Sequence, residues 1–234
     1  MNKLTIALLF AMIGVAMTSL VSCNKTNDDD SNTPINWVDL GLPSGLLWAD
    51  CNLGAATPYE LGDEFAWGET STKNYYEYSW SSYCYSNESG LLTKYCNNPE
   101  CGFDSFTDTL TWLESGDDAA TAYLGERVRI PTKEEWQELM DNTNKEIIVS
   151  PTKGCKFTAA NGNSIFMPMN WTGDGLYWSS SLDINAPNNA RCFAFSDGWA
   201  SYSYEGEPYS FMCVWCDERY KAHCVRAVCT QKKL

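Results

Sequence analysis

The segment Val128-Arg-Ile-Pro-Thr-Lys-Glu-Glu-Trp136 contains the clearest helix signal in this chain. Thr132 is a residue type that caps helices, and Glu135 follows three positions later, which is the spacing of a capping box. Apolar residues then recur at helical spacing and form one face, which consists of Trp136, Leu139 and Met140. The sequence therefore predicts a helix from Thr132 to Asn142.

Strand patterns lie on both sides of this helix. Residues 37–50 predict two strands joined by a turn at Pro43-Ser44-Gly45. After the helix, Asn161-Gly162 is a hairpin signal between two short strands. Later strand candidates are residues 176–180, 190–195, 211–215 and 223–229.

Residues 54–118 are rich in Gly, Ser, Asn and Tyr and show no sustained hydrophobic period. They predict a long loop region, with a short helix opening near Asp117-Asp118, where carboxylates favour a helix N-terminus. The expected class is α+β, with few helices, many short antiparallel strands and long loops. With no internal repeat and no inner boundary, residues 37–229 are predicted to form one domain, followed by a tail at 230–234.

The N-terminus has the features of an export signal. Lys3 gives a basic start, and residues 4–17 are almost uninterrupted apolar sequence that is too short to span a membrane comfortably. Leu20-Val-Ser-Cys23 resembles the bacterial lipobox, so residues 1–22 are predicted to be removed and Cys23 to carry lipid in a membrane. The alternative is an ordinary secretory signal with an incidental cysteine.

Residues 23–36 are polar and contain Asp28-Asp29-Asp30, which predicts a flexible, self-repelling tether. Acidic residues at this place also resemble the surface-export signal of Bacteroidetes lipoproteins. We therefore expect the cell envelope as the location, at the outer membrane and exposed on the surface, with the periplasmic face as the alternative.

The chain is strongly acidic. Its formal net charge is −14, and removal of residues 1–22, whose only charge is Lys3, leaves −14 − 1 = −15 on 234 − 22 = 212 residues. Such a surface repels nucleic acid and anionic lipid head groups, so neither is an expected direct partner. The bilayer is expected to be reached through the Cys23 lipid.

Ten cysteines remain besides Cys23, an even number that favours disulfides in an exported chain. Cys96 and Cys101 are the best candidates for a local bridge, and Cys51 for a bridge to Cys224 or Cys229. The Cys213-Val-Trp-Cys216 motif also allows redox chemistry, or a zinc site that recruits Cys213, Cys216, His223 and either Cys224 or Cys229. In one continuous strand, however, the side chains of Cys224 and Cys229 would face opposite sides, which weakens the zinc hypothesis.

Several motifs, taken in order, resemble the Fibrobacter succinogenes major paralogous domain family, which is abundant in Bacteroidetes lipoproteins. They lie at residues 38–55, 62–69, 92–95, 117–120, 128–136, 161–168, 177–180 and 225–228. Residues 129–136 also resemble the formylglycine-generating enzyme superfamily. Both resemblances imply a C-type-lectin-like fold, in which the chain ends pair and a long loop region projects from the core.

Charged residues of these motifs are expected to maintain the fold. Arg129 and Arg226 sit beside apolar residues and would need carboxylate or carbonyl partners if buried, which Glu69, Asp117 and Asp118 could supply.

Signals for an enzyme are thin. The chain has one histidine and no phosphate loop, nucleophile elbow or His-Glu-x-x-His motif. Cys213 and Cys216 depart in spacing from the copper-binding pair of formylglycine-generating enzymes, so that activity is not carried over. The calcium-binding triplets of true C-type lectins are absent, and no cofactor is expected, although an oxygen-ligand calcium site stays open.

Aromatic residues next to carboxylates provide the main binding hint, because such rings stack on sugars while carboxylates accept hydroxyl protons. The candidate ligand-binding residues are Trp67, Glu69, Tyr76, Trp80, Trp199 and Tyr202. Alternatively, these aromatics pack the long loops onto the core. The leading hypothesis is a surface-anchored module that binds a glycan or a protein, ahead of a structural subunit of a surface assembly and an enzyme of unknown reaction.

Overall fold

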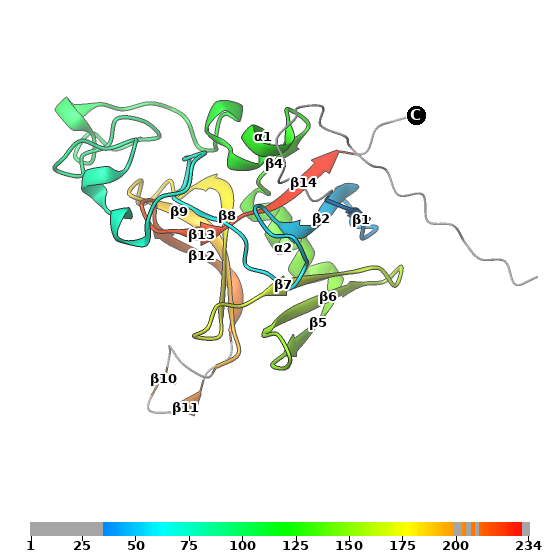
Figure 1. The fold of residues 1–234 in the computed structure, drawn as a ribbon. Coiled ribbons are helices and arrows are strands. Elements are labelled where there is room, and N and C mark those ends of the chain that lie inside the picture. The colour runs from blue at the N-terminus through cyan, green and yellow to red at the C-terminus, as the bar shows by residue number, and fades with distance from the viewer. Residues whose placement is uncertain (1–34, 199–202, 205–206, 209–210, 231–234) are drawn as a thin grey trace, which may run out of the picture.

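The computed structural model describes residues 35–198, 203–204, 207–208 and 211–230 (Figure 1). Short antiparallel strands dominate this part of the chain, and its two α-helices are α1 (Ala119–Leu124) and α2 (Lys133–Asn142). The prediction of few helices and many short antiparallel strands is confirmed, and this content fits an α+β or a mainly-β class.

The first sheet joins the two ends of the domain. Its strand order is β1 (Trp37–Asp39), β2 (Leu46–Asn52), β14 (Arg226–Thr230) and β4 (Val128–Arg129). Strand β14 pairs antiparallel with both β2 and β4. The expected pairing of the first and last parts of the domain is thus confirmed.

Two further sheets form the rest of the body. The larger has the order β12 (Met212–Glu218), β9 (Asn189–Ser196), β8 (Asp174–Leu182), β13 (His223–Cys224) and β3 (Glu64–Phe65). The smaller has the order β5 (Thr143–Ile148), β6 (Gly154–Ala159) and β7 (Ser164–Pro168). A short pair, β10 (Ser203–Tyr204) and β11 (Glu207–Pro208), completes the described strands.

The strand predicted over residues 223–229 is divided between two sheets. Cys224 in β13 pairs with Tyr177 in β8, whereas β14 starts at Arg226 and pairs with β2. Val225, at the crossing, gives its carbonyl to the amide of Leu53 at 3.0 Å. Cys224 therefore lies in one hydrophobic cluster and Cys229 in the other. The cause is the change of sheet, and not the alternation along one continuous strand that the sequence suggested.

Helix α2 begins as its sequence predicts. The Glu135 amide donates to Thr132 Oγ1 at 3.3 Å, and the Thr132 amide donates to Glu135 Oε2 at 2.8 Å, which completes the capping box. Its apolar face is buried against the smaller sheet and β8–β9. The strand β5 that follows was not predicted before residue 147, because residues 143–146 are polar and lack strand alternation.

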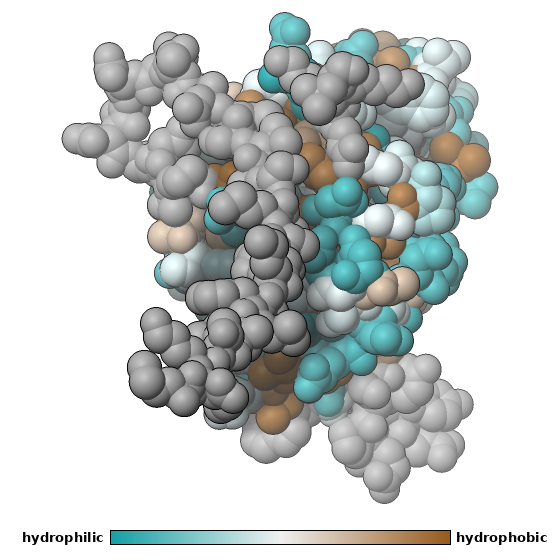
Figure 2. Space-filling view, turned by 90° about the vertical axis from the view of Figure 1, so that its right-hand side faces the viewer, coloured by the Kyte–Doolittle hydropathy of each residue, from teal (hydrophilic) through white to brown (hydrophobic). Residues whose placement is uncertain are grey.

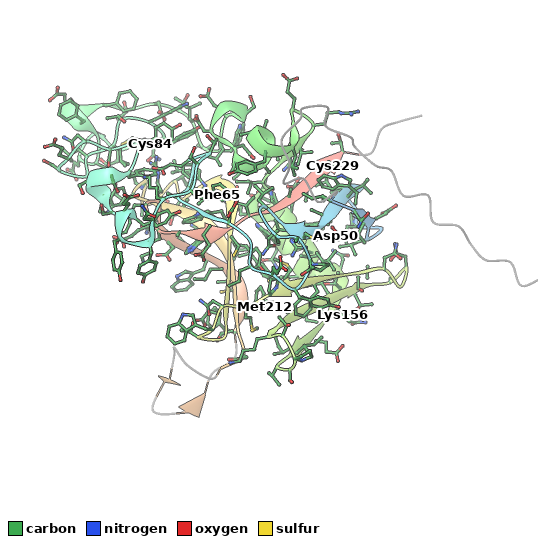
Figure 3. All side chains as sticks on the ribbon, in the orientation of Figure 1. Asp50, Phe65, Cys84, Lys156, Met212 and Cys229 are labelled. Carbon is green, nitrogen blue, oxygen red and sulfur yellow. The ribbon has the colours of Figure 1, made fainter. Side chains whose placement is uncertain are left out.

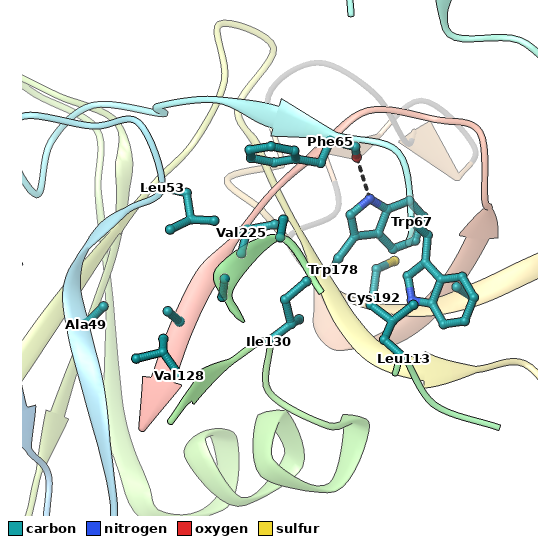
Figure 4. Close-up of a cluster of buried hydrophobic side chains, with 14 of the residues drawn as sticks. Ala49, Leu53, Phe65, Trp67, Leu113, Val128, Ile130, Trp178, Cys192 and Val225 are labelled. Atoms are coloured by element: carbon teal, nitrogen blue, oxygen red, sulfur yellow. Dashed lines mark hydrogen bonds between the residues drawn. The ribbon is translucent and has the colours of Figure 1, made fainter. Parts of the chain in front are cut away.

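Two hydrophobic clusters form the core. One surrounds Trp48, Trp136 and the phenylalanines of β6 and β9. The other surrounds Trp67 and Trp178, where the Trp178 Nε1–H donates to the Phe65 carbonyl at 2.7 Å (Figure 4). This second cluster joins the loop region to the larger sheet.

Arg226 is a fully buried arginine that joins three strands. It donates to Asn52 Oδ1 at 2.8 Å and to backbone carbonyls of Ala49, Asp50 and Phe166 at 2.9, 2.6 and 2.9 Å. Carbonyls, one of the two partner types expected for this residue, therefore satisfy most of its donors, and none of the three proposed carboxylates does.

Replacement of Arg226 by alanine should lower the free energy of unfolding by about 3 kcal/mol, because it leaves several buried acceptors without a donor. Arg226→Lys keeps the positive charge but has fewer hydrogen-bond donors, so its free energy of unfolding should lie between those of the wild type and Arg226→Ala. Urea denaturation measures both, with Arg127→Ala at an exposed site as the control. Equal stability of Arg226→Ala and Arg127→Ala would contradict this role.

Candidate functional site

The loop region, residues 66–118, is attached to the larger sheet by Arg219, which is fully buried. Its guanidinium donates to the Tyr83 hydroxyl at 2.9 Å, to the carbonyls of Tyr95 and Pro187 at 3.0 Å each, and to that of Lys94 at 3.1 Å. The rings of Trp67, Tyr83 and Tyr95 lie 5.0–5.8 Å from the guanidinium carbon. The buried guanidinium of Arg219 thus holds the loop region in place through hydrogen bonds and cation–π contacts.

A second polar cluster closes the loop region near its end. The Asp117 carboxylate accepts hydrogen bonds from Tyr85 at 2.5 Å, from Lys94 at 2.6 Å and from the Tyr95 hydroxyl. Burial alone would raise the pKa of Asp117, but these donors outweigh it and hold the pKa below its usual value. Two motifs far apart in sequence, at residues 92–95 and 117–120, therefore meet through an ionised carboxylate.

The expected partners of the motif arginines were partly wrong. Glu69 binds the Lys73 ammonium at 2.7 Å and the Cys84 amide at 2.8 Å. Asp118 caps α1 through the Thr121 amide. Arg129 instead binds both oxygens of Glu135, at 2.5 and 2.7 Å. These groups maintain the fold, as the sequence suggested, but with different partners.

Two of the six predicted ligand-binding residues are buried, and their assignment to ligand contact was wrong. Trp67 is 1% exposed, and its Nε1–H donates to the Ser179 carbonyl at 2.8 Å. Glu69 is 7% exposed and engaged with Lys73. Trp199 and Tyr202 lie outside the described residues.

The other two candidates lie at the surface of the loop region. Tyr76 is 93% exposed, and its neighbour Tyr75 is 81% exposed. Their ring centroids are 5.5 Å apart with an interplanar angle of 83°. We call Tyr75 and Tyr76 the tyrosine pair. Trp80 is half-buried and packs against Tyr220, with ring centroids 5.1 Å apart.

The turn beneath the tyrosine pair is held by local hydrogen bonds. The Asn74 amide donates to Glu77 Oε2 at 3.1 Å, and the Glu77 amide donates to the Asn74 carbonyl at 2.8 Å. Tyr78 donates from its hydroxyl to the Glu64 carbonyl at 2.7 Å and accepts from the Lys73 amide at 3.1 Å. Two neighbouring aromatic rings are thereby presented to solvent from an organised turn.

The most exposed of the aromatic residues that sequence analysis missed is Trp171, which is 90% exposed. It lies in the turn between β7 and β8, where Asn170 Oδ1 accepts from the Thr172 amide at 3.0 Å, the Thr172 hydroxyl at 2.6 Å and the Asp174 amide at 3.0 Å. The Asn-x-x-Gly sequence of this turn was the signal that could have placed Trp171 at the surface. On the face shown in Figure 2, hydrophobic residues are visible between hydrophilic ones.

None of the ten cysteines among the described residues forms a disulfide in this structure. Cys96 and Cys101 belong to one turn, in which both the Cys96 thiol and the Cys101 amide donate to the Asn98 carbonyl, so a bridge between them stays a prediction. Cys213 and Cys216 are three residues apart in β12 and therefore face opposite sides of that strand, unlike a thioredoxin-like motif.

The suggested bridges from Cys51 do not fit the strand register. Cys229 is paired with Leu47, four residues from Cys51 and thus roughly 13 Å along β2, beyond the reach of a disulfide. Cys224 lies beyond the residue that pairs with Asn52 and packs beside Tyr177. Figure 3 shows that Cys84, in the loop region, is also distant from Cys229. Burial raises the pKa of Cys51 and of Cys155 to about 12, which keeps both as thiols.

His223, in β13, is buried and contacts Asp217 in β12. Its Nε2 faces Asp217 Oδ2 at 3.2 Å, and its ring lies on Trp178 with centroids 4.2 Å apart. Burial alone would raise the pKa of Asp217, but His223 and Lys221 outweigh it and lower the pKa to about 2. Within the described ranges no group of three or more His, Cys, Asp or Glu could hold a metal ion, so the zinc and calcium hypotheses gain no ligand set there.

No helix among the described residues is both long and apolar enough to cross a bilayer. Comparisons with models of protein families, with curated proteins and with solved structures find no match to this chain. Its function is therefore inferred from the loop region and the residues it exposes.

Asp117→Asn should destabilise the protein by about 2 kcal/mol near pH 7, because it removes a charged acceptor from three donors. Since the folded pKa of Asp117 is lowered, its stabilisation is present above the unfolded value of 3.8 and is lost as the pH falls through the folded value. Urea denaturation across this range should show the difference from wild type shrinking in acid. Asp104→Asn, exposed in the same loop region, is the control. A pH-independent difference would contradict the account.

Proposed function

We propose that this protein is a lipid-anchored lipoprotein of the cell envelope whose tyrosine pair binds a saccharide. The observation that carries the proposal is the exposure of Tyr75 and Tyr76, at 81% and 93%, on an organised turn. Most other tryptophan and tyrosine rings of the loop region pack against the core or against Arg219. Exposed aromatic faces beside polar groups suit sugar rings, which have an apolar face and hydroxyls at the edge.

We further propose that the chain has a C-type-lectin-like fold and belongs to the Fibrobacter succinogenes major paralogous domain family. Pairing of β2 with β14 and the long loop region between β3 and β4 support the fold. The meeting of the Lys94-Tyr95 motif with Asp117 supports the family assignment, because motifs that define the resemblance are in contact.

The lipid anchor rests on residues 1–36, of which residues 1–34 lie outside the described part of the chain. A hydrophobic export segment that ends at Cys23 and is followed by an acidic tether favours acylation of that cysteine, and two or more acyl chains hold a protein stably on a bilayer. The acidic tether favours display at the surface of the outer membrane.

Metabolic labelling with a palmitate analogue should label the wild-type protein and not Cys23→Ser, because the lipid is attached at that thiol. Mass spectrometry should find the mature polypeptide starting at an acylated Cys23. Cys84→Ser removes an exposed thiol of the domain and should keep the label. A mature chain that retains Met1, or label that persists in Cys23→Ser, would exclude the anchor.

Replacement of Tyr75 or Tyr76 by alanine should weaken saccharide binding roughly fivefold, since one aromatic contact contributes about 1 kcal/mol. The double variant should lose more, and thermal unfolding should be unchanged because both rings are exposed. Binding is screened on a glycan array and then measured by calorimetry. Tyr59→Ala, 60% exposed and packed on Phe166, is the control. An equal loss in Tyr59→Ala, or no binding by the wild type, would refute the site.

A structural subunit of a surface assembly is the second candidate, and Trp171 is the observation that favours it. A tryptophan held at 90% exposure by a hydrogen-bonded turn is the residue type that anchors protein interfaces. Stable co-purification with other envelope proteins, in a protein that binds no glycan, would favour this function over the first.

A further inference from the structure

The loop region that carries the tyrosine pair is strongly acidic. Residues 66–118 contain two lysines and nine acidic residues, so their formal charge is 2 − 9 = −7. The acidic residues are Glu69, Glu77, Glu88, Glu100, Asp104, Asp108, Glu114, Asp117 and Asp118. A ligand that approaches the tyrosine pair therefore enters a negative potential.

The cation nearest in sequence to the tyrosine pair is already engaged. The Lys73 ammonium contacts Glu69 Oε1 at 2.7 Å and the Ser82 carbonyl at 2.6 Å. Its side chain is 20% exposed. A sulfate or carboxylate on a ligand would have to break this pair to gain a cation, and would leave Glu69 buried without its partner.

The other basic groups of the loop region and of the β12–β13 turn are engaged as well. Lys94 contacts Asp117 at 2.6 Å and Glu114 at 2.5 Å. Lys221 contacts Asp217 at 2.7 Å, and Arg219 is fully buried among carbonyls and rings. Anion-binding sites need a cation or a set of free amides, and the basic residues here serve the fold instead.

Several carboxylates of the region are directed inward too. Asp108 accepts from the Tyr95, Cys96 and Leu110 amides, at 2.7, 3.2 and 3.1 Å. Glu77 uses Oε2 to accept from the Asn74 amide and so closes the turn of the tyrosine pair. A neutral hydroxyl can still add to a carboxylate that is already half-occupied, whereas an anionic group is repelled by it.

We propose that the tyrosine pair takes an uncharged saccharide and discriminates against sugars that carry carboxylate or sulfate groups. This inference rests on the proposed saccharide binding and names the ligand class for that site. Binding comes from ring stacking and hydroxyl hydrogen bonds, which depend little on ionic strength, whereas acidic ligands are repelled by the region as a whole.

The test uses the full-length protein in detergent and soluble polysaccharides in matched pairs that differ in charge. The pairs are dextran with dextran sulfate, and methyl-esterified pectin with polygalacturonate. In any pair that binds, the neutral member should bind roughly tenfold or more tightly than its charged partner at low salt. Affinity for that neutral member should change less than about twofold when the salt concentration is raised, since no charge is screened.

Charge variants separate local from general repulsion. Glu77→Lys places a cation beside the tyrosine pair. It should reduce the ratio of the affinity for the neutral polysaccharide to that for its acidic partner several-fold. Glu100→Lys makes the same change of net charge at an exposed site in another turn and should reduce this affinity ratio less. Thermal unfolding of both variants checks that the turn survives.

Each outcome has a definite meaning. Tight binding of a charged member that weakens steeply with salt and is lost in Tyr75→Ala or Tyr76→Ala would overturn the neutral-ligand inference and leave saccharide binding at this site intact. Absence of binding to every member of every pair would overturn the inference and the proposed function together. Equal effects of Glu77→Lys and Glu100→Lys would also contradict discrimination at the tyrosine pair.

Discussion

The buried guanidinium of Arg219 is the constraint on which the loop region depends. Its four acceptors are one phenol and three carbonyls, contributed by segments that lie up to 136 residues away in sequence. A buried charge is costly unless its donors are satisfied, so the loop must return to this place for the fold to be stable. The three surrounding rings complete the enclosure and exclude water.

Arg219 and Arg226 perform related tasks near the end of the chain. Arg219 holds the loop region against β12, whereas Arg226 holds β14 against β2 and β7. The Arg219 carbonyl also accepts from the Trp67 amide at 2.8 Å, which continues the attachment along the backbone. Residues of the last strand, β14, belong to both hydrophobic clusters. The C-terminal part of the domain therefore connects the two clusters. The exposed turn of Tyr75 and Tyr76 is thereby connected to a rigid body.

Local sequence signals predicted local structure well. The Thr132–Glu135 capping box and the Asn161-Gly162 hairpin are both present. The pairing of the chain ends, which the family resemblance implied, is also present. The signals failed where tertiary contacts decide. Nothing within the aperiodic residues 66–118 distinguishes Trp67, which is buried, from Tyr76, which is exposed; that difference depends on Arg219, about 150 positions further on. The bridges suggested for Cys51 failed for a similar reason, since strand register is set by the whole sheet.

The buried cation of Arg219 holds the loop region in place, and the loop region in turn presents the two exposed rings of Tyr75 and Tyr76. Hydrogen–deuterium exchange in the wild type and in Arg219→Met tests this dependence most directly, because exchange reports local opening segment by segment. The account predicts that amides of residues 83–95 exchange slowly in the wild type and much faster in the variant, while β2 and β14 stay protected. Unchanged protection of residues 83–95 in Arg219→Met would contradict it.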